Sequence, residues 1–245
     1  MGITVNRIIK VVTIIRKSKP IHFLQYDKRW GSIMFSNHND KKQTIASSGC
    51  GAASSAMVIN AFLSKEITPP DVAKTIIQNG YRTYNNGVDW GWFPFMSKHY
   101  GLQFKQTYST DEAIEALKQN ALIIASMSKG YFTSGGHYIM LWGLDEKNKQ
   151  ILVNDPNSTI RTKANYNIFK QQCRNYFIFY EPERNDKVEE LKDWQIKAGS
   201  DSVNNLVKKG LINNPDDWKQ KLGELVPNWL FFTMLDRISD FKGGK

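Results

Sequence analysis

The sequence predicts an α+β fold followed by a small all-α module, and three observations lead to this prediction. Apolar residues recur at helical spacing in the first half of the chain, whereas short apolar runs separated by turns follow between residues 121 and 180. Helices followed by an antiparallel sheet are typical of the α+β class. A charged linker at residues 181–187 then leads into a segment of helical pattern. We therefore divide the chain into domains of residues 1–182 and 183–245.

The composition is that of a globular protein that can bury a substantial core. Hydrophobic residues make up 41% of the 245 residues and aromatic residues 12%, which excludes a disordered chain. The two cysteines, Cys50 and Cys173, are too few for a disulfide framework, and a free reactive thiol is compatible with this number. Nothing in the sequence resembles a zinc cluster, and we expect no metal and no cofactor.

The whole excess of positive over negative charge lies in the first part of the chain. The formal net charge is +10; residues 1–182 contain 22 Lys/Arg against 12 Asp/Glu, whereas residues 183–245 contain 11 of each. A basic surface favours polyanions, of which nucleic acid and the anionic polymers of a bacterial cell wall are two candidates. A solvated basic face without a ligand is the alternative. Because no basic motif with stacking aromatic residues stands out, we do not expect nucleic-acid binding.

The amino-terminal run Ile8–Ile15 is apolar, but it predicts neither a membrane anchor nor a signal peptide. It is shorter than the ~20 residues that span a bilayer, Lys10 interrupts it, and no small-residue cleavage site follows. Its β-branched residues indicate a strand or an extended arm laid on the domain. We therefore expect a protein with no transmembrane segment that is made in the cytoplasm without a conventional export signal.

Three helices are expected in the first part of the chain. The first begins near Cys50, and its apolar residues predict burial along one side; they are Ala56, Met57, Ile59, Phe62 and Leu63. The two prolines within Thr68–Asp71 separate this helix from the second one. The third helix is capped by Ser109 or Thr110 and has an acidic first turn.

Between Asn79 and Gly101 the chain is rich in glycine, asparagine and aromatic residues. Aromatic residues at this density either line a cleft or pack beneath a long loop, and both interpretations remain open at this stage. We interpret His99, within this segment, as a surface or packing residue.

Four short segments predict an antiparallel sheet. They are residues 121–127, 137–143, 151–156 and 175–180. A turn at residues 145–149 joins the second segment to the third, so these two are expected to form a hairpin.

The second domain is predicted to consist of four helices. Their ranges are residues 189–198, 202–209, 216–225 and 228–238, with prolines and glycines between them. Three tryptophans of this domain, Trp194, Trp218 and Trp229, are either core residues or contacts with a ligand such as the cell wall.

Cys50 is the candidate nucleophile because of its position at the start of a helix. The first turn of a helix carries unpaired N–H groups and the positive end of the peptide dipoles, so a thiol there loses its proton more easily. The small residues Gly49 and Gly51 are expected to let a substrate backbone approach the sulfur. A buried cysteine acting as a small hydrophobic residue is the alternative.

Cysteine catalysis also needs a base and a group that orients it, and His137 and Asp155 are the candidates. His137 follows two glycines at the start of a predicted strand, and Asp155 lies at the end of the strand that pairs with it. The hairpin brings these two positions together across the ladder. Alone, each has an ordinary structural explanation, but their occurrence together in the order Cys, His, Asp favours a catalytic triad.

Gln25 is the candidate oxyanion donor, with the backbone N–H of Cys50 as its partner. Gln43, seven residues before the cysteine, is the rival for this role.

Several blocks of the sequence resemble papain-fold cysteine peptidases related to the double-glycine leader peptidases of bacteriocin exporters. The blocks are Gln25–Trp30, Thr44–Gly51, Gly136–Tyr138 and Asn154–Pro156, and the resemblance covers roughly residues 20–180. The most similar branch carries no transporter and includes cell-wall hydrolases of bacteria and their phages.

The resemblance implies a papain-like fold of helices packed on an antiparallel sheet. It also implies that Cys50 is the nucleophile, His137 the base, Asp155 the orienting acid and Gln25 the oxyanion donor. One departure concerns Gln25: leader peptidases have their glutamine a few residues before the cysteine, whereas 25 positions separate the two residues here.

The predicted function is therefore a thiol-dependent hydrolase, of endolysin or cell-wall hydrolase type, that cleaves an amide or peptide bond in peptidoglycan. Its site of action is then the bacterial cell wall or the extracellular space after release. Two alternatives remain open: a cysteine peptidase acting on proteins or leader peptides, and a non-catalytic binding or structural module on a peptidase scaffold.

Overall fold

The computed structural model describes residues 19–84, 87–182, 193–220 and 222. The chain divides into two compact units, residues 1–182 and residues 183–245, which are described separately. The predicted amino-terminal arm at Ile8–Ile15 and the predicted helix at residues 228–238 lie outside the described residues. Among the residues described, no helix combines the length and apolar character needed to cross a membrane.

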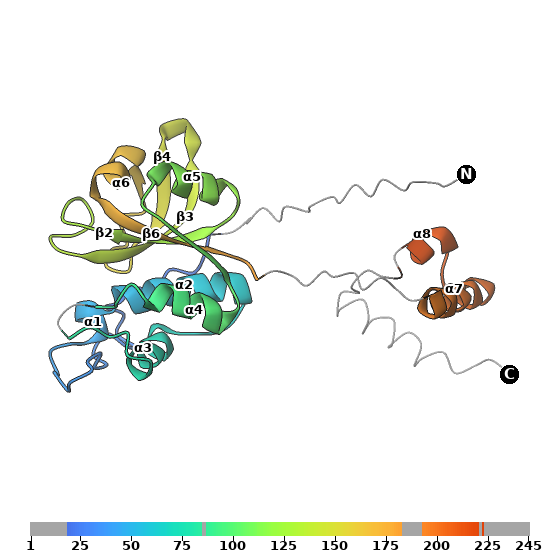
Figure 1. Ribbon diagram of the computed structural model, residues 1–245, viewed down its shortest axis with the longest axis horizontal. Helices are drawn as coiled ribbons and strands as arrows, with labels where there is room; N and C mark the ends of the chain where they lie inside the picture. Colours follow the sequence, from blue (N-terminus) through green and yellow to red (C-terminus); the bar gives the residue numbers. More distant parts are fainter. Residues whose placement is uncertain (1–18, 85–86, 183–192, 221, 223–245) are drawn as a thin grey trace. The chain divides into compact units, whose positions relative to one another are not determined.

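Four helices form a layer on one face of the sheet in the first unit (Figure 1). They are α1 (Ile45–Ser48), α2 (Cys50–Leu63), α3 (Pro69–Gln78) and α4 (Trp92–Tyr100). The start of α3 agrees with the prediction: Thr68 is its N-cap, prolines occupy its first turn and Asp71 completes a capping box.

The second layer is a six-stranded sheet in which all neighbouring strands run antiparallel. Its strands are β1 (Gln103–Thr107), β2 (Leu122–Met127), β3 (His137–Asp145), β4 (Gln150–Asn154), β5 (Lys163–Asn165) and β6 (Cys173–Tyr180), in the order β1-β6-β2-β3-β4-β5. The α+β class is confirmed, and so is the predicted hairpin, because β3 pairs with β4.

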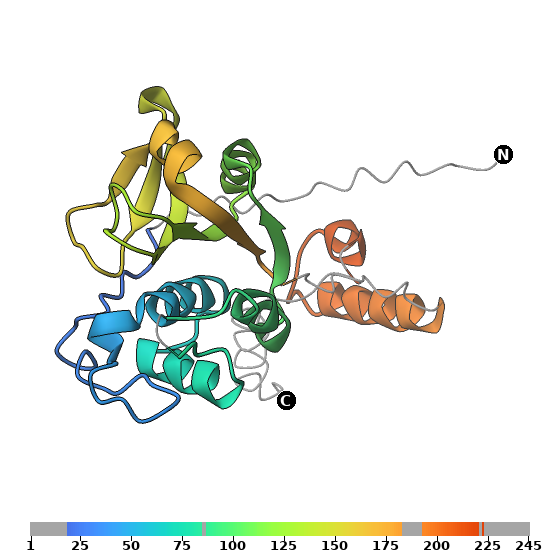
Figure 2. The ribbon, with the colours of Figure 1, turned by 60° about the vertical axis from the view of Figure 1, so that its left-hand side comes forward.

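Helices α5 (Thr110–Lys118) and α6 (Tyr166–Gln172) cover the opposite face of the sheet, as the turned view in Figure 2 also shows. Strand β2 is buried at every position because it has a layer on each face. Leu122 and Ile124 belong to the cluster beneath α2, whereas Ile123 and Ala125 belong to the cluster beneath α5 and α6. The sheet therefore lies between two apolar cores.

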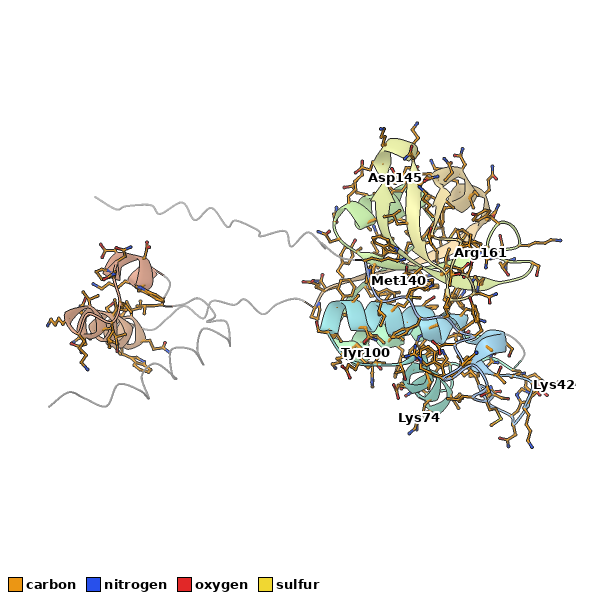
Figure 3. All side chains as sticks on the ribbon, turned by 180° about the vertical axis from the view of Figure 1, so that it is seen from behind. Lys42, Lys74, Tyr100, Met140, Asp145 and Arg161 are labelled. Atoms are coloured by element: carbon orange, nitrogen blue, oxygen red, sulfur yellow. The ribbon has the colours of Figure 1, made fainter. Side chains whose placement is uncertain are left out.

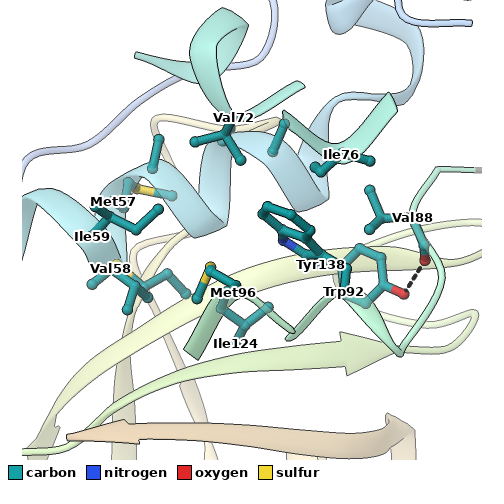
Figure 4. Close-up of a cluster of buried hydrophobic side chains, with 14 of the residues drawn as sticks. Met57, Val58, Ile59, Val72, Ile76, Val88, Trp92, Met96, Ile124 and Tyr138 are labelled. Carbon is teal, nitrogen blue, oxygen red and sulfur yellow. Dashed lines mark hydrogen bonds between the residues drawn. The ribbon is translucent and has the colours of Figure 1, made fainter. Parts of the chain in front are cut away.

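Helix α2 is more buried than the sequence pattern predicts. Every residue from Gly51 to Ile59 is buried, so the expectation of burial along one side only is wrong for the first three turns. Figure 4 shows Met57, Val58 and Ile59 of α2 among side chains from α3, α4 and the sheet. A helix enclosed on all sides loses the polar face from which a one-sided pattern is recognised.

The aromatic segment between residues 79 and 101 contains helix α4, which the sequence analysis did not predict. Trp92 and Phe93 are fully buried in it, and the indole N–H of Trp92 donates to Ser55 Oγ at 2.9 Å. These residues therefore pack in the core, while Tyr84 (64% exposed) and Trp90 (38% exposed) lie at the surface.

In the second unit, the structure describes α7 (Asp193–Lys208) and α8 (Pro215–Gln220). The prediction of two helices at residues 189–198 and 202–209 is wrong, because α7 continues through Gly199. A Cβ at Gly199 would lie 2.7 Å from Leu222 Cδ2, so this glycine makes room for a packed leucine instead of ending a helix. Trp194 and Trp218 are exposed, and Trp229 lies outside the described residues.

Candidate active site

Cys50 is the first residue of α2, and its backbone is fixed by the short helix α1. Thr44 and Ser47 form a capping box at the start of α1, and the Gly49 N–H donates to Ile45 O at 2.8 Å. Gly49 thus ends one helix and begins the next. The half-buried thiol therefore lies where α2 presents unpaired N–H groups.

The two glycines beside Cys50 are required by packing, and that they also let a substrate backbone approach the sulfur remains a prediction. A Cβ at Gly49 would lie 2.5 Å from Ile45 O, and one at Gly51 would lie 2.8 Å from Val88 Cγ2 and 3.3 Å from Tyr138 Cδ2. The first turn of α2 therefore packs closely against Ile45, Val88 and Tyr138.

Tyr138 joins the first turns of α2 to the sheet. Its backbone carbonyl accepts from Ser54 Oγ at 3.3 Å, and its phenolic O–H donates to Val88 O at 2.8 Å. The second of these bonds is drawn in Figure 4. His137 precedes Tyr138 as the first residue of β3.

His137 lies between the thiol and a carboxylate. Its Nε2 is 2.7 Å from Asp155 Oδ1, and its imidazole is also hydrogen-bonded to the Cys50 side chain. Because Nε2 faces Asp155, Nδ1 is the ring nitrogen that remains for the sulfur. The structure thus brings together the three residues that sequence analysis selected as a candidate triad.

Asp155 is fully buried and has partners beyond His137. Its Oδ1 accepts from the Asn157 N–H at 2.8 Å, and its Oδ2 accepts from Arg161 Nε at 2.6 Å. His22 Nε2 donates to the Asp155 carbonyl at 2.7 Å. Figure 3 labels Arg161 on the sheet side of the junction between the two layers. Sequence analysis missed Arg161 and His22, because neither lies in a motif.

The charges of the three residues support one another. Burial raises the pKa of the Cys50 thiol, but His137 and the N–H groups of Tyr138 and Gly51 outweigh it, so the pKa lies below its usual value. Burial lowers the pKa of His137, but Asp155 and Cys50 raise it to about 9. Burial also raises the pKa of Asp155, but the hydrogen bond from His137 holds it below its usual value. A thiolate–imidazolium pair is therefore favoured.

Gln25 lies beside the short helix that precedes Cys50, despite the 25 positions between them. It is buried, its N–H donates to Pro156 O at 2.8 Å, and its Nε2 donates to Ala46 O at 2.7 Å. Pro156 follows Asp155, so the backbone of Gln25 is fixed by the loop after Asp155. The side-chain amide of Gln25 is fixed by α1. One N–H of Nε2 is engaged by Ala46, and the second remains for another acceptor.

Gln43 uses both ends of its amide within the protein. Its Nε2 donates to Tyr84 O at 2.8 Å, and its Oε1 accepts from Arg82 Nη2 at 2.8 Å. This engagement favours Gln25 over Gln43 as the oxyanion donor. Arg82 is a further residue near the site that the sequence analysis missed.

The second cysteine lies in a different environment. Cys173 begins β6, and its Sγ donates to Asn175 O at 3.2 Å. Burial raises the pKa of this thiol to about 12. Cys173 therefore stays protonated at neutral pH, and it provides a matched control for Cys50.

Comparisons with known proteins give a family for most of the first unit. A family model described as the Peptidase_C39 like family matches residues 31–185. A search of the curated proteins finds no significant match.

Two solved structures are similar to the chain. The peptidase domain of Streptococcus ComA, a bifunctional ABC transporter involved in a quorum-sensing pathway, is 17% identical, with a TM-score of 0.44, over 55% of this chain and 93% of that domain. A C39-like peptidase from Bacillus anthracis is 12% identical, with a TM-score of 0.45, over 67% of this chain and 98% of the other.

Proposed function

The chain belongs to the Peptidase_C39 like family, which supports a cysteine peptidase function, and from this premise we propose that Cys50, His137 and Asp155 are a catalytic triad that cleaves an amide bond in bacterial peptidoglycan. The observation that carries the proposal is the position of His137, whose ring contacts both the thiol and the buried carboxylate. A histidine with both contacts can accept a proton from the thiol and keep the orientation needed to return it.

The reaction consists of two transfers. The Cys50 thiolate forms a bond to the substrate carbonyl carbon, the C–N bond breaks, and the proton of His137 goes to the leaving amine. Water then gives a proton to His137 and its oxygen forms a bond to the same carbonyl carbon, so the thioester bond breaks and the thiolate returns. The Cys50 N–H and the second N–H of Gln25 Nε2 are the proposed donors to the oxyanion.

The choice of peptidoglycan depends on the charge of the first unit and on the chemistry of the site. All of the net charge of +10 is in residues 1–182, which favours association with the anionic polymers of a bacterial wall. The peptides of the wall supply the amide bonds that a thiol hydrolase cleaves. We accordingly propose the cell wall as the place of action.

The test uses the full chain, isolated cell walls and an unfolded protein as the alternative substrate. Wild type and Cys173→Ala should release amines and soluble fragments from the walls, and Cys50→Ala should release none above background. Mass analysis of the fragments identifies the bond. Cleavage of the unfolded protein alone, dependent on Cys50, would replace the proposed substrate, and equal activity of Cys50→Ala and wild type would exclude the triad.

A further inference from the structure

Arg82 is a buried cation close to the candidate active site. It follows α3, its side chain is only 2% exposed, and the guanidinium carbon lies 4.4 Å from the centre of the Phe35 ring. At this exposure it cannot bind a substrate directly, so its function must be exerted through residues that it contacts.

Neutral groups satisfy the hydrogen bonds of Arg82 but not its charge. The acceptors are Phe35 O (2.8 Å from Nε), Gly87 O (2.6 Å from Nη1), Gln43 Oε1 (2.8 Å from Nη2) and Ser48 Oγ (3.1 Å from Nη2). None of the carboxylates in the described part of the chain forms an ion pair with Arg82. A buried charge without a counter-charge is costly, so an anion nearby would stabilise the folded protein.

The contacts of Arg82 lead to both sides of Cys50. Ser48 comes two residues before the cysteine. Gly87 precedes Val88, which packs against Gly51 immediately after the cysteine. Arg82 thus connects the segment that enters α2 with the segment that covers its first turn.

We propose that Arg82 is a positioning residue of the site whose positive charge stabilises the thiolate of Cys50. The inference rests on the proposed function, because it needs Cys50 to react as a thiolate. Burial lowers the pKa of Arg82, whereas the charge of Cys50 raises it. Because Arg82 has no carboxylate partner among the described residues and donates to Ser48 Oγ, two residues before Cys50, a thiolate at Cys50 would supply the missing counter-charge, and removing the cation should make the thiolate harder to form.

The test measures the rate of alkylation of Cys50 by iodoacetamide as a function of pH, which requires no substrate. All variants carry Cys173→Ala, so that Cys50 is the only thiol. Arg82→Gln should move the midpoint of thiolate formation up by about one pH unit, which is about a tenfold lower rate below the midpoint. Ser48→Ala, which removes one neutral bond and leaves the charge, should not move it.

Arg82→Lys separates charge from structure. It keeps the cation but not the guanidinium's set of bonds, so the midpoint should stay within about 0.3 units of wild type while the melting temperature falls. A shift of a full unit in Arg82→Lys, or an unchanged midpoint in a folded Arg82→Gln, overturns the inference. Should Arg82→Gln fail to fold, a full-unit shift of the midpoint in Arg82→Lys still overturns the inference.

The failure of the proposed function has a different signature. In that case the wild-type midpoint itself lies at the value of an ordinary thiol, about 8.5. A low wild-type midpoint that Arg82→Gln leaves unchanged excludes only the role of Arg82.

Discussion

Replacing Asp155 with asparagine tests how the carboxylate acts on His137. The substitution removes one negative charge and keeps the size of a side chain that is fully buried. Asparagine retains an oxygen that can accept a hydrogen bond but cannot balance the charge of an imidazolium. The substituted site should therefore keep its packing and lose its ion pair.

The expected change in the pKa of His137 follows from the contact between His137 Nε2 and Asp155 Oδ1, at 2.7 Å. A carboxylate this close raises the pKa of a buried imidazole by about 1–3 units, or about 1.4–4 kcal/mol. Without it, the pKa of His137 falls from about 9, and the proton it holds returns to the sulfur of Cys50. The thiolate–imidazolium pair should become at least about tenfold less populated relative to the neutral pair.

Alkylation of Cys50 by iodoacetamide near neutral pH measures this change directly, because only the thiolate reacts. Asp155→Asn should react at least about tenfold more slowly than wild type at pH 6.5. Asp145→Asn is the matched control, because Asp145 lies at the other end of β3 from His137. Equal rates in Asp155→Asn and wild type, with both folded, would refute the reasoning.

Three further predictions concern the same region. Gly49→Ala should lower the free energy of unfolding by about 1–3 kcal/mol, because its Cβ would lie 2.5 Å from Ile45 O, whereas Gly135→Ala, with no atom within 4 Å of its Cβ, should change it by less than about 0.5 kcal/mol in urea titrations. Arg161→Gln should raise the pKa of His137, because the Asp155 carboxylate then loses its second cation, whereas Asp155→Asn should lower this pKa. NMR titration of the His137 imidazole measures both shifts, and shifts of the same sign would contradict the prediction. The pKa of Asp155 is lowered in the folded state, so its stabilisation is present above about pH 3.9 and is lost as the pH falls through the folded value; acid unfolding curves of wild type and Asp155→Asn that run parallel would contradict this.

The juxtaposition of His137 and Asp155 could be predicted from the sequence because it depends on local information. Two apolar runs joined by a short turn define a hairpin, and the antiparallel ladder places the start of one strand near the end of the other. In the observed ladder Met140 pairs with Asn154. This register places His137 and Asp155 near one another. Only the neighbouring element of the chain is needed for this inference.

The surroundings of Cys50 could not be predicted in the same way, because they depend on contacts between distant segments. Arg82 reaches Ser48 across 34 positions, and Gln25 reaches Ala46 across 21. Neither residue belongs to a periodic pattern, so nothing local indicates its partner. Strands β1 and β5 were missed for a related reason: at the edges of the sheet, they lack the continuous apolar run of a central strand.

The small residues around Cys50 connect the fold to the chemistry. Cys50 belongs to the helical layer, whereas His137 and Asp155 belong to the sheet side, so the distance between thiol and imidazole depends on how closely α2 approaches β3. Gly51 allows that approach, because the side chains of Val88 and Tyr138 occupy the space that its Cβ would need. A larger residue at this position would separate the two layers where the proposed proton transfer takes place, so Gly51 supports the proposed chemistry through packing.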